Sequence, residues 1–78
     1  MSIEQFIVQF SDTIQGDAAS IRPETRLNDI VEFDSMGRLS VMAMLDTRFG
    51  FIAQAEQLER CETVRDLFAF ALARKATT

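Results

Sequence analysis

Apolar residues return at every third or fourth position along most of this chain, and this spacing restricts the chain to a helical fold. The first segment already has five of them on one helical face: Ile3, Phe6, Ile7, Phe10 and Ile14. Ser2 and Gln5, three residues apart, resemble a capping box at the start of such a helix, and Gly16 suits its end. No run of alternating polar and apolar residues is bounded by hairpin turns, so strands are not expected.

The stretch from residue 15 to residue 33 breaks this periodicity. Pro23 interrupts it, and residues that favour turns surround the proline: Gly16, Asp17, Thr25 and Asn28. We expect Ile21, Leu27 and Ile30 to anchor the stretch to the core, with a short helical turn over residues 27–30. A connection of this length is uncommon in a compact domain, and it indicates a functional role.

The second half of the chain predicts three more helices. The second begins at Ser35, is capped by Asp34 or Ser35 and stops at Gly50, with one apolar face: Met36, Leu39, Val41, Met42, Leu45 and Phe49. A short third helix covers roughly residues 54–60. Thr63 and Asp66 can cap the last helix, which carries Val64, Leu67, Phe68, Ala71 and Leu72. The fold class is therefore all-α, a four-helix bundle with a long loop between its first two helices.

The composition fits one small domain spanning residues 1–78. Of the 78 residues, 47% are hydrophobic, enough to pack a core and to argue against disorder. No apolar run approaches the length of a membrane span, and the first ten residues lack the basic start and cleavage site of a signal peptide. Because Cys61 is the only cysteine, an internal disulfide is excluded. We expect a cytoplasmic monomer that does not insert into membranes.

The charges and the missing residue types exclude several functions. A net charge of −4 without a basic stripe argues against nucleic-acid binding and favours a protein partner with a basic face. There is no histidine, one cysteine cannot build a zinc site, and no glycine-rich phosphate loop is present. A serine nucleophile would lack its usual general base. We therefore expect a chain that catalyses nothing by itself.

One motif remains, and it sits where the long loop turns into the second helix. The segment Phe33-Asp34-Ser35-Met36 resembles the Asp-Ser-Leu motif of acyl carrier proteins, whose serine receives 4′-phosphopantetheine from coenzyme A. Alone, such a triplet also fits an ordinary helix cap. The resemblance continues before the motif at Ile21, Pro23, Thr25, Leu27, Asp29 and Ile30. It continues after the motif at Leu39, Val41, Met42, Leu45, Phe49, Leu58, Thr63, Val64, Leu67 and Phe70.

The resemblance implies a carrier that holds acyl, aminoacyl or aryl groups as thioesters on a 4′-phosphopantetheine arm. The arm would be attached covalently to Ser35, and Asp34 would assist the modifying transferase, partly through its magnesium ion. The implied partners are a phosphopantetheinyl transferase, an acyl- or adenylate-forming loading enzyme and downstream synthases. In the family, cargo can lie between the helices, here beside Met42, Leu45, Leu58 and Phe70. The alternative is an unmodified helical interaction module that keeps the carrier fold.

The second helix departs from the family pattern. Met36 replaces the leucine of the motif, a tolerated swap between flexible apolar residues. Arg38 and Arg48 stand where carriers of fatty-acid synthesis place carboxylates, so we expect a specialised pathway for a polyketide, a modified lipid or an activated amino or aryl acid. We expect partners to contact four residues, with both arginines exposed: Met36, Arg38, Leu39 and Arg48. Gly37 leaves room for a partner or is a tolerated surface glycine, and Cys61 is expected as a small core thiol.

Overall fold

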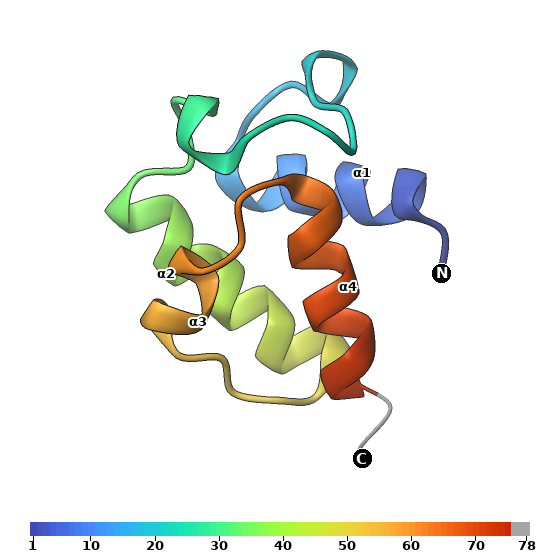
Figure 1. The fold of residues 1–78 in the computed structure, drawn as a ribbon, viewed down its shortest axis with the longest axis vertical. Helices are drawn as coiled ribbons and strands as arrows, with labels where there is room; N and C mark the ends of the chain where they lie inside the picture. Colours follow the sequence, from blue (N-terminus) through green and yellow to red (C-terminus); the bar gives the residue numbers. More distant parts are fainter. Residues whose placement is uncertain (76–78) are drawn as a thin grey trace.

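The computed structural model describes residues 1–75, and four helices carry its architecture (Figure 1). The helices are α1 (Ile3–Ile14), α2 (Ser35–Met44), α3 (Ala55–Glu59) and α4 (Val64–Lys75). Three shorter elements complete the chain: the 3-10 turns η1 (Ala18–Ser20) and η2 (Leu27–Asp29), and the π-helical segment η3 (Leu45–Phe49). The all-α prediction, with a long loop before α2 and a short α3, is confirmed.

Helix α1 begins at the predicted capping box. The Ser2 hydroxyl oxygen accepts the Gln5 N–H at 3.2 Å, and the Gln5 side chain accepts the Ser2 N–H at 3.0 Å. The end of the helix differs from the prediction, because Gln15 rather than Gly16 takes the left-handed conformation, with φ of 60°. Gly16 instead donates its N–H to the Ser11 carbonyl at 2.8 Å, so the helix closes one residue earlier.

The loop between α1 and α2 is fixed to the rest of the molecule at its middle. Ile21, Leu27 and Ile30 are buried as predicted, and η2 is the expected helical turn. Next to η2, Arg26 pairs with Thr63 in an isolated antiparallel bridge. The Leu27 N–H donates to the Glu62 carbonyl at 2.8 Å, so the loop runs alongside the segment that leads into α4 (Figure 1).

Helix α2 turns a different face to the core than its apolar spacing predicts. Gly37, Val41 and Met44 are buried, Met42 is half-buried, and the side chains of Met36 and Leu39 are 75% and 63% exposed. The expectation that Leu39 and Met36 belong to the core face is therefore wrong. The helix widens into η3 after Met44, which brings Leu45 and Phe49 into the core. Gly50 ends the segment in the left-handed conformation, with φ of 77°.

The core centres on Phe6 of α1. Its ring centroid lies 6.0 Å from that of Phe49 and 5.2 Å from that of Phe68, so one aromatic ring joins α1 to η3 and α4. Leu58 supplies the buried contact of α3, whose five residues are otherwise largely exposed. A helix this short is marginal alone and depends on such packing.

Helix α4 begins at the cap predicted from Thr63 and Asp66. The Asp66 N–H donates to the Thr63 hydroxyl at 3.2 Å, and the Asp66 carboxylate accepts the Thr63 N–H at 3.2 Å. In the part of the chain that the structure describes, no helix combines the length and the apolar character that crossing a membrane requires.

Candidate attachment site at the start of helix α2

Ser35 is the first residue of α2, and its side chain is exposed. Asp34 caps the helix, because its Oδ1 accepts the Gly37 N–H at 2.9 Å. Within residues 1–75 the Ser35 hydroxyl makes no hydrogen bond, so Ser35 does not cap the helix. The structure thus decides between the two caps that the sequence left open, and it leaves the Ser35 oxygen accessible to another molecule.

Gly37 fixes how the loop meets the helix. It is buried, and a β-carbon built on it would overlap the carbonyl oxygen of Glu32. Both sequence interpretations of this residue, room for a partner and a tolerated surface glycine, are therefore wrong. Only glycine lets the loop backbone approach the first turn of α2 this closely. That approach sets the path of the chain into Asp34 and Ser35.

Exposed apolar side chains flank Ser35 on both sides in sequence. Val31 is 86% exposed, Met36 follows Ser35 directly, and Leu39 lies one turn later on the same side of the helix. Large exposed apolar side chains at one place are typical of an interaction site. Their exposure agrees with the expectation that partners contact Met36 and Leu39.

Arg38 is held against the protein, in contrast to the exposed arginine that we expected. Its side chain is 31% exposed, and Nη1 lies 4.0 Å from Oε1 of Glu59 on α3. The guanidinium carbon lies 5.8 Å from the centroid of the Phe33 ring. The Nε atom is buried and has no hydrogen-bond partner among the described residues. Arg48 is exposed, as expected.

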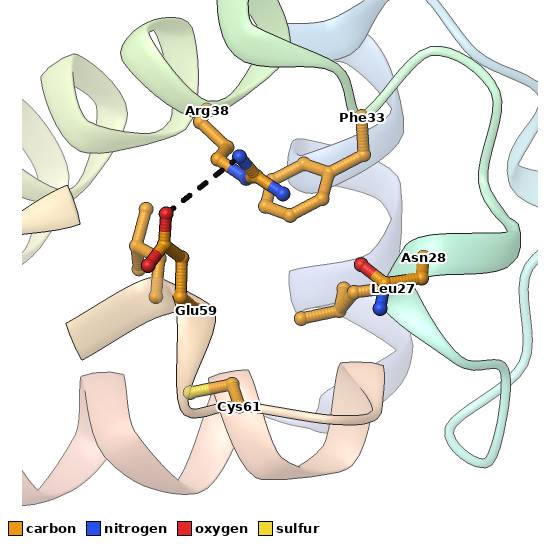
Figure 2. Close-up of a pocket in the computed structure, with 7 residues that line it drawn as sticks. Leu27, Asn28, Phe33, Arg38, Glu59 and Cys61 are labelled. Carbon is orange, nitrogen blue, oxygen red and sulfur yellow. Dashed lines mark ion pairs between the residues drawn. The ribbon is translucent and has the colours of Figure 1, made fainter. Parts of the chain in front are cut away.

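A cavity of about 180 Å³ lies beneath Arg38 (Figure 2). Its wall is formed by η2, α2 and α3 together with the segments just before α2 and just after α3. The lining residues are Leu27, Asn28, Phe33, Arg38, Leu58, Glu59 and Cys61. Of the residues expected beside a cargo, only Leu58 lines it, whereas Met42, Leu45 and Phe70 do not. The sequence gives no sign of Asn28 or Glu59 as site residues, because only the fold brings them near Arg38.

Cys61 lines this cavity and packs half-buried against the edge of the core, so it is less buried than the core thiol that we expected. Burial away from water raises the pKa of the Cys61 thiol, and the negative charge of Asp66 raises it further. Its Sγ lies 3.6 Å from the Gln57 carbonyl oxygen, to which the thiol donates weakly. The Cys61 thiol is therefore a poor nucleophile at neutral pH.

Comparison with known proteins agrees with this site. The family model described as "phosphopantetheine attachment site" matches residues 4–71. The acyl carrier protein MbtL of Mycolicibacterium paratuberculosis (strain ATCC BAA-968 / K-10) is 34% identical over 67 residues, which cover 86% of this chain and 75% of that relative. No solved structure matches the chain significantly. The helical fold of this chain and the two matches establish that the chain is a carrier of the acyl carrier protein family, whose members carry 4′-phosphopantetheine.

Proposed function

We propose that Ser35 is the attachment residue and that this chain carries acyl intermediates for a specialised biosynthetic pathway. The observation that carries the assignment is the exposed, unpaired Ser35 hydroxyl at the first position of α2. An enzyme that modifies this serine can reach its oxygen without opening the fold. The chain itself supplies no base for that step, so the transferase must take up the hydroxyl proton when the new O–P bond forms and the nucleotide part of coenzyme A leaves.

The start of α2 suits a phosphodiester. Its first backbone N–H groups and the positive end of the helix dipole favour an anion at this position. The two carboxylate oxygens of Asp34 would have different roles. Oδ1 accepts the Gly37 N–H and caps the helix, and Oδ2 would contact the transferase and its magnesium ion. The group that arrives at Ser35 would bring a flexible thiol arm, which presents a thioester-bound cargo to successive enzymes.

The surface around Ser35 supports a specialised set of partners. Met36 and Leu39 offer apolar contacts, Arg48 adds an exposed positive charge, and the charge of Arg38 is partly offset by Glu59 at 4.0 Å. Near Ser35 such a surface complements an apolar or acidic docking face, in contrast to the basic face that the net charge of the whole chain favours. We propose that the loading enzyme and the downstream synthases have docking faces of that kind.

Modification in vitro tests the assignment. Incubation with coenzyme A, magnesium and a broad-specificity transferase should add the mass of one phosphopantetheine to the wild-type chain. Ser35→Ala should gain nothing while its circular dichroism stays helical. Ser40→Ala removes an exposed hydroxyl from the same helix and should be modified like the wild type. A modified Ser35→Ala chain would place the arm elsewhere, and an unmodified wild type would contradict attachment at Ser35.

A further inference from the structure

A groove of about 370 Å³ opens beside the proposed attachment residue, between the end of α1 and the start of α2. Both sequence neighbours of Ser35, Asp34 and Met36, line this groove, so its rim begins where the arm would be attached. The groove and the cavity beneath Arg38 lie on different sides of α2, because Met36 and Arg38 are two residues apart and point in nearly opposite directions. A group tethered at Ser35 can therefore enter the groove without any opening of the fold.

The part of the groove next to Ser35 is apolar. Ile14 packs against Gly37, since a β-carbon on Gly37 would stand 3.4 Å from Cγ2 of Ile14, and both residues line the groove. The exposed side chain of Met36 adds an apolar wall. In a phosphopantetheine arm, the segment nearest the serine carries a pair of methyl groups. Those methyl groups match the apolar surface that Ile14 and Met36 provide.

Two polar side chains of the groove have hydrogen-bonding groups that no other residue among residues 1–75 engages. The Gln15 amide lines the groove from the end of α1, and it can both donate and accept hydrogen bonds. The Glu32 carboxylate lies close to the same helix end, because its Oε1 would be 3.6 Å from a β-carbon on Gly16. These groups complement the amides of a pantetheine arm, whose N–H groups can donate to Glu32 and whose carbonyl oxygens can accept from Gln15.

The backbone of Gln15 also singles this residue out. Gln15 ends α1 in the left-handed conformation, with φ of 60°, although Gly16 follows directly and would adopt that conformation without strain. A left-handed backbone at a residue with a side chain costs free energy, and such residues cluster at functional sites. Because the helix closes one residue early, the side chain at this turn is an amide, and it lies in the wall of the groove.

Charge and volume decide which part of the arm the groove accepts. Glu32 and Asp34 are acidic, and the lining residues include no cation, so the phosphate is repelled from the groove and stays at Ser35. A cavity of about 150 Å³ takes up benzene, so about 370 Å³ has room for roughly fifteen non-hydrogen atoms. The groove consequently suits most of the uncharged pantetheine part, with the thiol and its cargo left outside.

From these observations, we propose that the groove between α1 and α2 holds the pantetheine part of the arm while no partner is docked, with Gln15 and Glu32 binding its amides. The proposal rests on attachment at Ser35. It places the resting arm on the α1 side of α2, away from the cavity beneath Arg38. Since partners are proposed to contact Met36, their docking would displace the arm from the groove and make it available to them.

Nuclear magnetic resonance of the arm tests the proposal. The transferase attaches a ¹⁵N- and ¹³C-labelled arm from labelled coenzyme A, and mass spectrometry must first show one arm on the wild type and none on Ser35→Ala. The methyl groups of the arm should then show nuclear Overhauser contacts to the methyl groups of Ile14 and Met36. The order parameter of the arm amide nearest Ser35 should exceed about 0.6, the upper limit for a flexible amide.

Two substitutions remove the polar contacts and leave the core intact. Gln15→Gly deletes the side chain and suits the left-handed backbone, so this variant keeps its fold. Together with Glu32→Ala, it should lower the ratio of bound to free arm about fivefold, the scale of one net hydrogen bond, and bring the order parameter below about 0.6. Glu24→Ala is the matched control, because it removes an exposed carboxylate of the same loop outside the groove. It should leave the arm as it is in the wild type.

Three results on the modified chain would overturn the proposal. The first is an arm that is flexible throughout in the wild type. The second is contact of the arm methyl groups with Leu27 and Leu58, which line the cavity beneath Arg38, in place of Ile14. The third is an arm that stays equally ordered in the double variant. A wild type that gains no arm, or a Ser35→Ala chain that gains one, would instead refute the attachment at Ser35 on which the groove assignment rests.

Discussion

Gly37 and Glu32 lie so close together that a β-carbon on Gly37 would overlap the Glu32 carbonyl oxygen. We expect Gly37→Ala to lower the free energy of unfolding by about 1–2 kcal/mol. The overlap is with a backbone atom, which puts the overpacking cost in the upper part of a range of about 1–3 kcal/mol, and helix propensity returns about 1 kcal/mol of it. Thermal unfolding followed by circular dichroism measures the change, expected as a drop of about 4–8 °C in Tm for each kcal/mol. Ser40→Ala, at an exposed position of α2, should leave Tm nearly unchanged. A Gly37→Ala chain as stable as the wild type would show that the loop backbone at Glu32 can move away from α2 at little cost in free energy.

Asp34 should affect stability and modification separately. Asp34→Ala removes the acceptor of the Gly37 N–H and should cost about 1 kcal/mol of unfolding free energy, whereas Asp34→Asn can keep that bond. Both variants lose the carboxylate and should be modified more slowly by the transferase. Denaturant unfolding and the initial rate of modification are measured on the same samples. If Asp34→Asn is modified as fast as the wild type, the carboxylate plays no part in the reaction.

Arg48 should weaken docking to enzymes that have a basic docking face. Its charge is exposed on η3, so Arg48→Glu should raise kcat/KM of such an enzyme with the loaded carrier several-fold at low salt, mainly through faster association. Added salt should shrink the gain, because exposed charges are screened. Arg38→Asp is unsuited to this test, since it would place a carboxylate beside Glu59. Arg22→Glu makes the same charge change on the loop, and an equal gain there would rule out a local effect of Arg48.

Cys61 should make stability depend on pH in the alkaline range. Its pKa is raised in the folded chain, mainly by burial and also by Asp66, so the unfolded chain ionises first. The contribution of Cys61 is complete below the pKa of an unfolded thiol, about 8.5, and is lost as the pH rises toward the folded pKa. Tm measured from pH 7 to pH 10 should therefore fall more steeply for the wild type than for Cys61→Ser. If Tm falls equally with pH in the wild type and in Cys61→Ser, the Cys61 thiol is hydrated in the folded chain.

Helix starts were predictable from the sequence because local hydrogen bonds fix them. Ser2 with Gln5 and Thr63 with Asp66 form their bonds within three residues, so short sequence patterns suffice to find them. The core face of α1 also followed from spacing, since its buried positions are nearly all apolar.

The buried face of α2 was not predictable in the same way. Its first buried residue is Gly37, which has no side chain and gives no hydrophobic signal. Apolar Met36 and Leu39 lie on the exposed side, so the spacing indicates two faces at once. The position of Arg38 against Glu59 depends on how α3 packs, and no local pattern encodes that contact. The sequence could therefore identify Ser35 as a candidate, but not its neighbours across the fold.

The bridge between Arg26 and Thr63 also has a consequence for how quickly the chain folds. It joins two residues far apart in sequence, and both α2 and α3 lie in the segment that it closes. This long sequence separation raises the contact order of a helical protein. Closing such a segment loses chain entropy before the contacts inside it can compensate. The pairing of residue 26 with residue 63 should therefore form late in folding. Folding should be slower than in a bundle whose helices meet only their neighbours in sequence.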